Sequence, residues 1–183
     1  YPDQPWRPCV HIPELVAHRG YPLHYPENTL IGIEAAINAG ARYIEVDVQL
    51  SADRVPVLFH DRNLDRLCRA PGSIHEFTRD QLRDFRVLEF DRFGYRYAQT
   101  PIAALAELAA LLARHSQVHA FIEIKRVAIE HSGAPAVLDA TLARWVAPVS
   151  QGGSRPVAPN SLVGLRPRVG DEADEAPGPA TTT

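Results

Sequence analysis

The sequence predicts an α/β fold, in which short β-strands alternate with helices around a parallel sheet. Two observations carry this prediction. Between residues 14 and 147 of the 183-residue chain, strand-like hydrophobic runs are followed by segments whose apolar residues have helical spacing, which is the pattern of three consecutive β-α units. The composition, with 45% hydrophobic and 22% charged residues, is that of an ordinary globular domain.

The first unit starts with a strand over residues 14–18. After a proline-containing loop, either Asn28 or Thr29 is expected to cap a helix, because both side chains can accept a hydrogen bond from a backbone N–H of the first turn. Gly40 is expected to end this helix, since glycine tolerates the left-handed conformation that often follows a helix C-terminus. The apolar residues that share one face of the helix are Leu30, Ile33 and Ile37.

The second unit has a strand over Tyr43–Leu50, in which apolar and polar residues alternate strictly. A further strand-like run over residues 55–59 leads into a His-Asp pair. A short helix is expected next, because Thr78 and Gln81, three residues apart, form a capping box.

The clearest helix is predicted to start at Thr100 and Pro101, a capping residue followed by a residue that fits the first helical position. Its apolar stripe is Ile102, Leu105, Leu108 and Leu112. The third strand is expected over residues 118–125, and the helix after it over Ala134–Val146. The packing face of that last helix is Val137, Leu138, Thr141, Leu142 and Trp145.

Residues 150–183 are predicted to form a disordered tail, distinct from a domain over residues 1–149. About half of the tail is Ala, Gly, Pro or Arg and it has no hydrophobic period, so it cannot bury enough apolar surface to offset the entropy of ordering. The chain contains no Met, from which we expect that it is trimmed at its start or is a gene fragment.

Charge and hydropathy argue against several classes of protein. The net charge of −3 does not favour nucleic-acid binding. No run approaches the roughly 20 apolar residues that cross a bilayer, so no membrane anchor is expected. Cys9 and Cys68 are too isolated in sequence for a disulfide framework or a zinc site. The compartment stays open on these features, with a cytoplasmic location favoured.

Acidic residues lie on one face of two predicted strands. The period of two places Glu45 and Asp47 on the same face of the second strand, opposite its aliphatic residues. Glu123 and Lys125 are placed in the same way in the third strand. If helices cover a parallel sheet on both faces, burying these carboxylates costs several kcal/mol each unless a countercharge is present. A bound cation is the simplest countercharge.

An antiparallel sheet with one solvent-exposed face is the alternative, and either strand alone is compatible with it. Other polar residues favour the first interpretation, because each of them follows or ends a strand. These residues are His18 and Arg19 after the first strand, His60 after the run over 55–59, and Lys125 at the end of the third strand. The carboxyl ends of strands are where α/β proteins place their active sites.

The residue types together indicate metal-assisted displacement at phosphorus. Three carboxylates suit a hard divalent cation such as Ca²⁺ or Mg²⁺. A guanidinium and an ammonium can hold a phosphate, and two imidazoles can transfer protons near neutral pH. The candidates are Glu45, Asp47 and Glu123 for the metal, Arg19 and Lys125 for the phosphate, and His18 and His60 for proton transfer.

The same residues lie in five short motifs between residues 17 and 125. The motifs are Ala-His-Arg-Gly from residue 17, Pro-Glu-Asn-Thr from residue 26, Glu-Val-Asp-Val from residue 45, His-Asp at residues 60–61 followed by Leu64 and Arg66, and Glu-Ile-Lys from residue 123. In order and spacing they resemble the glycerophosphodiester phosphodiesterase family. The resemblance implies a TIM-type (β/α)8 barrel. Here we expect only a partial barrel of about three to four strands, because a complete one needs eight strands and roughly 250 residues.

The resemblance also implies an enzyme of lipid metabolism that hydrolyses a small-molecule glycerophosphodiester to glycerol 3-phosphate and an alcohol. One divalent cation is implied, Mg²⁺ or Ca²⁺, with Mn²⁺ also suitable. The roles that it implies are metal binding by Glu45, Asp47 and Glu123, acid–base catalysis by His18 and His60, and phosphate contact by Arg19 and Lys125. Glu27 is expected to support the site, Asp61 to orient its loop or His60, and Arg66 to pair with an acidic neighbour. No role is expected for His11, His24, His75, His115, His119 or His131.

Two alternatives stay open. The chain is a non-catalytic product of truncation or frameshift that keeps at most metal or phosphate binding, or it is a related phosphodiesterase such as a phospholipase D of the sphingomyelinase type. An open half-barrel also exposes two strand edges, which favours self-association.

Overall fold

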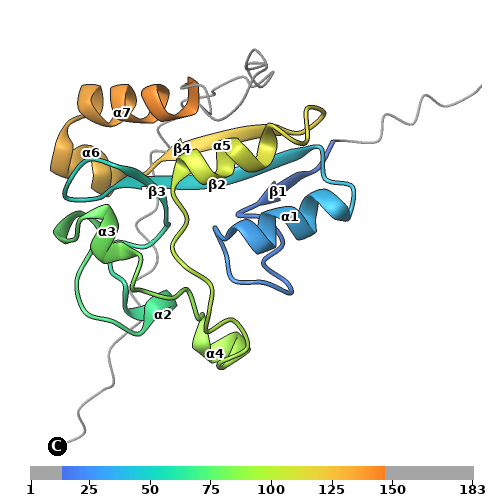
Figure 1. Ribbon diagram of the computed structural model, residues 1–183, viewed down its shortest axis with the longest axis horizontal. Helices are drawn as coiled ribbons and strands as arrows, with labels where there is room; N and C mark the ends of the chain where they lie inside the picture. The colour runs from blue at the N-terminus through green and yellow to red at the C-terminus, as the bar shows by residue number, and fades with distance from the viewer. Residues whose placement is uncertain (1–13, 147–183) are drawn as a thin grey trace, which may run out of the picture.

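The structure is a computed structural model that describes residues 14–146 (Figure 1). At its centre β2 (Tyr43–Leu50) pairs with three other strands. Strands β1 (Val16–His18) and β4 (His119–Ile124) lie parallel to β2, and β3 (Pro56–Leu58) pairs antiparallel with its last residues. The predicted α/β fold with a partial parallel sheet is confirmed, and the sheet does not close into a barrel within residues 14–146.

The predicted tail over residues 150–183 lies outside the described residues, as do Cys9 and His11. The predicted boundary between this tail and a domain over residues 1–149 therefore stays a prediction. Within the described part of the chain, no helix combines the length and the apolar character needed to span a membrane.

The register of the sheet aligns the polar residues of its parallel strands. His18 on β1 is level with Glu45 on β2, and Glu123 on β4 is level with Asp47 on β2. Because parallel strands end at the same edge of a sheet, these residues are brought to one end. The backbone pairing alone therefore places most of the candidate site.

Helices α1 (Leu30–Asn38) and α5 (Leu105–Leu112) pack on the face of the sheet that carries its aliphatic residues (Figure 1). Trp145, near the end of α7 (Ala134–Val146), joins the same core. The fully buried members of this core include Ile33, Ile44, Val46, Val48, Leu105 and Leu108. Burying each of these side chains contributes roughly 1.5–3 kcal/mol to the free energy of folding. The apolar face therefore stabilises the sheet that carries the polar residues on its other face.

The segment between β3 and α5 forms a second, smaller unit of short helices. Its elements are α2 (Asp65–Cys68), the single 3-10 turn η1 (Ile74–Glu76), α3 (Arg79–Leu82) and α4 (Phe90–Phe93). Its own core includes Leu64, Leu67, Ile74, Leu82 and Ile102, all fully buried. The predicted capping box is confirmed at the start of α3, where the side chain of Thr78 accepts from the backbone of Gln81 and the side chain of Gln81 accepts from the backbone of Thr78.

Helix α1 begins and ends where the sequence predicts. Thr29, one of the two predicted caps, accepts a hydrogen bond from the backbone N–H of Gly32. Gly40 follows the helix with φ +99°, the left-handed conformation expected of a terminating glycine.

The helix predicted to start at Thr100 was placed too early, because α5 begins at Leu105. The preceding segment is extended instead. The carbonyl of Thr100 accepts from the backbone N–H of Val87, and the carbonyl of Ala103 accepts from that of Leu58. Pairing with distant segments therefore outweighs the local preference for a helix.

Three further observations concern the sheet and its helices. β3 is antiparallel to β2, because the loop over residues 51–55 is too short for the crossover that a parallel strand needs. Helix α6 (Arg126–Ser132) was not predicted and follows β4 directly, with Lys125 as its N-cap. The packing face predicted for α7 is narrower than expected, since Leu142 is exposed.

The outer edges of β1 and β4 have no strand partner within residues 14–146. Beside the β1 edge, Leu15 and Val16 are 81% and 46% exposed. Such an edge presents unpaired backbone donors and acceptors. The expected self-association through these edges stays a prediction.

Candidate active site

Three carboxylates converge at one end of the sheet. Glu45 and Asp47 lie two residues apart on β2 and therefore share one face of the sheet. The register of the parallel β2–β4 pair places Glu123 beside Asp47. One oxygen atom of each carboxylate lies within 4.8 Å of the other two, close enough for all three to contact a single cation. The structure therefore brings together the three residues predicted to hold a metal.

One oxygen of the Glu45 carboxylate lacks the partner that a buried acceptor needs. Its Oε1 atom is buried and has no hydrogen-bond partner among the described residues. Burial, together with the negative charges of Asp47 and Glu123, raises the pKa of Glu45 to about 7. A divalent cation would supply both the missing partner and the missing positive charge. The donor set therefore fits a hard ion such as Mg²⁺ or Ca²⁺.

Arg19 and Lys125 both approach the carboxylate of Asp47. The Nε atom of Arg19 lies 3.0 Å from Oδ2 of Asp47, and the Nζ atom of Lys125 lies 3.4 Å from Oδ1. Lys125 also donates a hydrogen bond of 3.0 Å to Oε1 of Glu123. Because the side chain of Asp47 is only 1% exposed, its charge depends on these cations. Both predicted phosphate-binding residues thus border the carboxylates.

His18 lies at the end of β1, at the entrance to this group. Its Nε2 atom is 3.6 Å from Oε2 of Glu45, and its side chain is 59% exposed. Partial burial, together with the positive charge of Arg19, lowers the pKa of His18. The neutral imidazole, which can accept a proton, is therefore favoured.

His60 follows the short strand β3, and its ring lies near the carboxylates of Asp61 and Glu27. The preceding residue, Phe59, donates its backbone N–H to the backbone carbonyl of Asp47 at 3.0 Å, which ties this part of the chain to β2. Gln49 fixes the next residues, because its buried Nε2 contacts the carbonyls of Phe59, His60 and Asp61 at 3.1, 3.2 and 2.6 Å. Gln49 lies two residues after Asp47, on the same face of β2, but no role was predicted for it.

Asn28 has a role that the sequence analysis missed. Its backbone has φ +55°, a left-handed conformation that Asn tolerates better than most residues. Its Nδ2 donates to Oδ2 of Asp47 at 2.9 Å, and its Oδ1 accepts from the backbone N–H of Asp47 at 3.1 Å. Thr29 alone is enough to cap α1. The presence of Asn28 beside it, in the same motif, was therefore the signal in the sequence for another role.

Gly20 lets the loop after β1 pack closely against α1. Its φ is +93°, and a Cβ atom at this position would lie 2.9 Å from the carbonyl carbon of Gly32. Both features require glycine. The tight turn leaves the backbone N–H of Arg19 free to donate to the carbonyl of Glu45 at 2.9 Å, which anchors the loop to β2.

A second group of possible metal ligands surrounds Arg66. Single ligand atoms of Glu27, His60 and Asp61 lie within 4.8 Å of one another. The guanidinium of Arg66, however, hydrogen-bonds the carboxylates of both Glu27 and Asp61. Glu27 also pairs with Arg19 at 3.2 Å. Each carboxylate oxygen of Glu27 and Asp61 already accepts a hydrogen bond, unlike Oε1 of Glu45, so this group is not a second candidate metal site.

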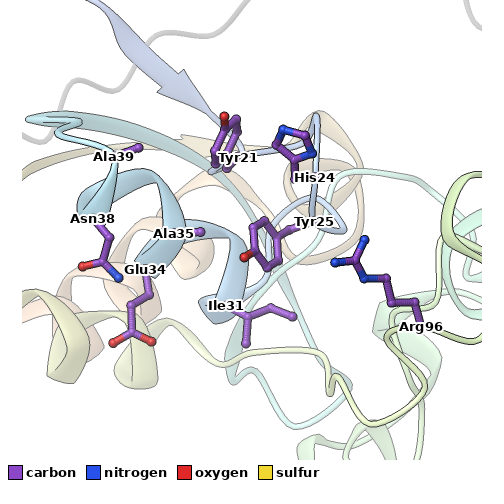
Figure 2. Close-up of a pocket in the computed structure, with 9 residues that line it drawn as sticks. All are labelled: Tyr21, His24, Tyr25, Ile31, Glu34, Ala35, Asn38, Ala39 and Arg96. Atoms are coloured by element: carbon purple, nitrogen blue, oxygen red, sulfur yellow. The ribbon is translucent and has the colours of Figure 1, made fainter.

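A separate open pocket lies on the exposed side of α1, as Figure 2 shows. Its lining residues are Tyr21, His24, Tyr25, Ile31, Glu34, Ala35, Asn38, Ala39 and Arg96. None of the seven predicted site residues is among them, so the candidate site lies elsewhere, at the end of the sheet.

The chain is similar in sequence to a family of known proteins. The model of the glycerophosphoryl diester phosphodiesterase family matches residues 18–157. A glycerophosphodiester phosphodiesterase of Bacillus altitudinis is 32% identical over 120 residues, covering 66% of this chain and 48% of that protein. Glycerophosphodiester phosphodiesterase 1 of Mus musculus is 33% identical over 110 residues, covering 60% of this chain and 33% of that protein. The chain thus spans between a third and a half of the length of these curated relatives.

Solved structures show the same partial match. A phosphodiesterase of Oleispira antarctica, in complex with the product sn-glycerol-3-phosphate, superposes with a TM-score of 0.64 and 28% identity, over 72% of this chain and 51% of that chain. The glycerophosphodiester phosphodiesterase of Thermotoga maritima superposes with a TM-score of 0.55 and 32% identity, over 72% of this chain and 49% of that chain.

Proposed function

Because the chain belongs to the glycerophosphoryl diester phosphodiesterase family, we propose that it hydrolyses glycerophosphodiesters to glycerol 3-phosphate and an alcohol with the help of one divalent cation. The observation that carries the proposal is the convergence of Glu45, Asp47 and Glu123 within 4.8 Å of one another. The proposal extends to this chain an activity that the family shares. The Oleispira antarctica relative, solved with sn-glycerol-3-phosphate, supports the assignment of the product.

Glu45, Asp47 and Glu123 are the residues that would hold the cation, with Mg²⁺ or Ca²⁺ preferred and Mn²⁺ also accepted. When bound, such an ion polarises a phosphoryl oxygen and neutralises charge that develops during displacement. The unpartnered oxygen of Glu45 supports this assignment, because a buried acceptor without a donor is costly.

Arg19 and Lys125 are the residues that would bind the phosphate. In the structure both contact the carboxylate of Asp47. A cation among the carboxylates would take over part of this neutralisation and leave donors of both side chains available to the anionic substrate. The phosphate would then lie between fixed positive groups, which is how enzymes stabilise charge at phosphorus.

His18 and His60 are the residues that would transfer protons. Hydrolysis adds water across the P–O bond to the alcohol. One imidazole accepts the proton of the attacking oxygen while the other donates a proton to the oxygen that leaves with the alcohol. Afterwards the protonation states of the two histidines are reversed, and proton exchange with solvent restores them for the next turnover.

The test uses the purified 183-residue chain with glycerophosphocholine and Mg²⁺, Mn²⁺ or Ca²⁺ in turn. Release of glycerol 3-phosphate is followed with a coupled dehydrogenase assay, and folding is verified by circular dichroism. We expect activity that disappears with a chelator and that Glu45→Gln or Glu123→Gln reduces by at least about 100-fold, since each removes a ligand charge. Glu34→Gln, which neutralises an exposed carboxylate of α1, is the matched control and should keep full activity.

The alternatives make different predictions in the same experiment. A folded chain that titrates cations in a calorimeter but releases no glycerol 3-phosphate would be a non-catalytic binding fragment. Turnover of sphingomyelin or lysophosphatidylcholine in place of glycerophosphocholine would identify the related phospholipase D class. Either result would overturn the proposed substrate.

A further inference from the structure

Resting on the proposed function, we infer that Arg66 is a positioning residue whose single guanidinium orients both the proton-transferring His60 and the phosphate-binding Arg19. Arg66 lies on the one-turn helix α2. Among residues 14–146, its hydrogen bonds go to Glu27 and Asp61 and not to the three candidate metal ligands. It acts through two intermediate carboxylates, one on each side.

The first intermediate is Asp61. Arg66 Nε donates to Oδ2 of Asp61 at 2.5 Å, and Nη2 donates to Oδ1 at 2.8 Å. This is the paired, parallel geometry in which arginine binds a carboxylate most specifically. Oδ1 of Asp61 in turn lies 2.9 Å from Nδ1 of His60.

The contact with Asp61 determines which nitrogen of His60 carries the proton. Burial alone would favour the neutral carboxyl, but hydrogen bonds from His60 and Arg66 hold the pKa of Asp61 well below its usual range. An ionised carboxylate can only accept hydrogen bonds, so neutral His60 must carry its proton on Nδ1. Its Nε2 then presents a lone pair, as a general base requires.

The second intermediate is Glu27. Arg66 Nη2 donates to Oε1 of Glu27 at 2.8 Å, and Nη1 reaches Oε2 at 3.3 Å. The same Oε1 accepts from Nη1 of Arg19 at 3.2 Å. Glu27 is buried, so its side chain is held in one place between the two guanidinium groups.

One arginine therefore ties two segments that are distant in sequence. Its partners Glu27 and Asp61 come from the loop after β1 and the loop after β3. A lysine could neutralise charge here, but its single ammonium cannot pair in parallel with two carboxylates. The planar fork of donors is what fixes the angle of both carboxylates at once, and through them the orientation of His60 and Arg19.

The test is nuclear magnetic resonance of the histidine side chains at pH 8, where long-range ¹H–¹⁵N correlations show which ring nitrogen is protonated. The His60 signals are assigned by their absence in His60→Gln. In the unmodified chain we expect the proton on Nδ1. In Arg66→Gln we expect loss of that single tautomer and a mixture with the Nε2–H form. Arg62→Gln, which removes a nearby arginine that pairs with Glu130, should leave His60 unchanged.

A second variant covers the case in which Arg66→Gln does not fold. Arg66→Lys keeps the charge, so we expect it to fold and still to lose the single tautomer. A folded Arg66→Gln or Arg66→Lys chain in which His60 keeps one tautomer would overturn the inference, and so would a proton on Nε2 in the unmodified chain. These results do not depend on turnover. If the tautomer changes as expected while the unmodified chain hydrolyses no glycerophosphodiester, the positioning role stands and the proposed function fails.

Discussion

Asn28 and Asp47 hold each other by a reciprocal pair of hydrogen bonds, one through the carboxylate and one through the backbone N–H of Asp47. Asp47 is thereby fixed in position and orientation. Ligand-orienting residues of this kind typically change metal affinity by 10- to 100-fold when they are removed. Asn28→Gly keeps the left-handed backbone, which glycine adopts freely. We expect it to weaken cation binding about 10-fold in a calorimetric titration, and an unchanged affinity would contradict the orienting role.

The metal-free chain should become less stable as the pH rises from 4.5 to about 7. The folded-state pKa of Glu45 is raised from 4.5 to about 7, so the folded chain holds this proton more tightly than the unfolded chain does. Protonation of Glu45 therefore stabilises the folded chain fully below pH 4.5, and this stabilisation is lost as the pH rises to 7. The free energy of unfolding falls by at most about 3 kcal/mol. In the presence of a chelator, Glu45→Gln should remove this pH dependence and be the more stable chain at pH 8. The free energy of unfolding is measured with urea at each pH. The same pH dependence in both chains would refute the expectation.

Gly20 and Gly40 form a matched pair for a stability test. Both have positive φ, but a Cβ atom at Gly20 meets the backbone of Gly32 whereas one at Gly40 meets nothing within 4 Å. Gly40→Ala should therefore cost only the strain of the conformation, about 1 kcal/mol. Gly20→Ala adds a backbone clash and should cost about 2–4 kcal/mol in denaturant unfolding. Equal losses for the two variants would mean that the turn at Gly20 relaxes.

Gln49 should control the order of the loop that carries His60. Gln49→Leu leaves three carbonyl groups without their shared donor, which costs about 1–3 kcal/mol for buried acceptors. We expect amide hydrogens of residues 59–62 to exchange much faster in this variant, while exchange in α5 speeds up only by the amount that the loss of global stability explains. Uniform acceleration over the whole chain would show that Gln49 stabilises the fold rather than this loop.

The sequence was sufficient to predict the strands and the residues that converge on the candidate metal site. Alternation along β2 assigns Glu45 and Asp47 to one face, and parallel pairing then requires Glu123 to lie beside them. These features depend on local periodicity and on one rule of sheet geometry. That is why the fold class and the acidic group could be predicted.

Features that depend on contacts between distant segments could not be predicted. The start of α5 is set by one bridge from Ala104 to Val57 of β3 and another from Pro101 to Arg86, which a local pattern does not contain. Asn28 meets Asp47, which is 19 residues away along the chain. Arg66 pairs with its acidic neighbour Asp61, as predicted, but its second partner, Glu27, is 39 residues away. A polar residue in a motif has several local explanations, and only the fold identifies the partner that it meets.

The parallel pairing of β2 with β4 has a consequence for the order in which the chain folds. The two strands are separated by the whole unit of short helices and by α5, so they meet only after a long loop has closed, which is a slow event. An ion bound by both Glu45 and Glu123 would form a reversible cross-link between the two strands. Because this cross-link forms only once the strands have met, it should slow unfolding far more than it speeds folding.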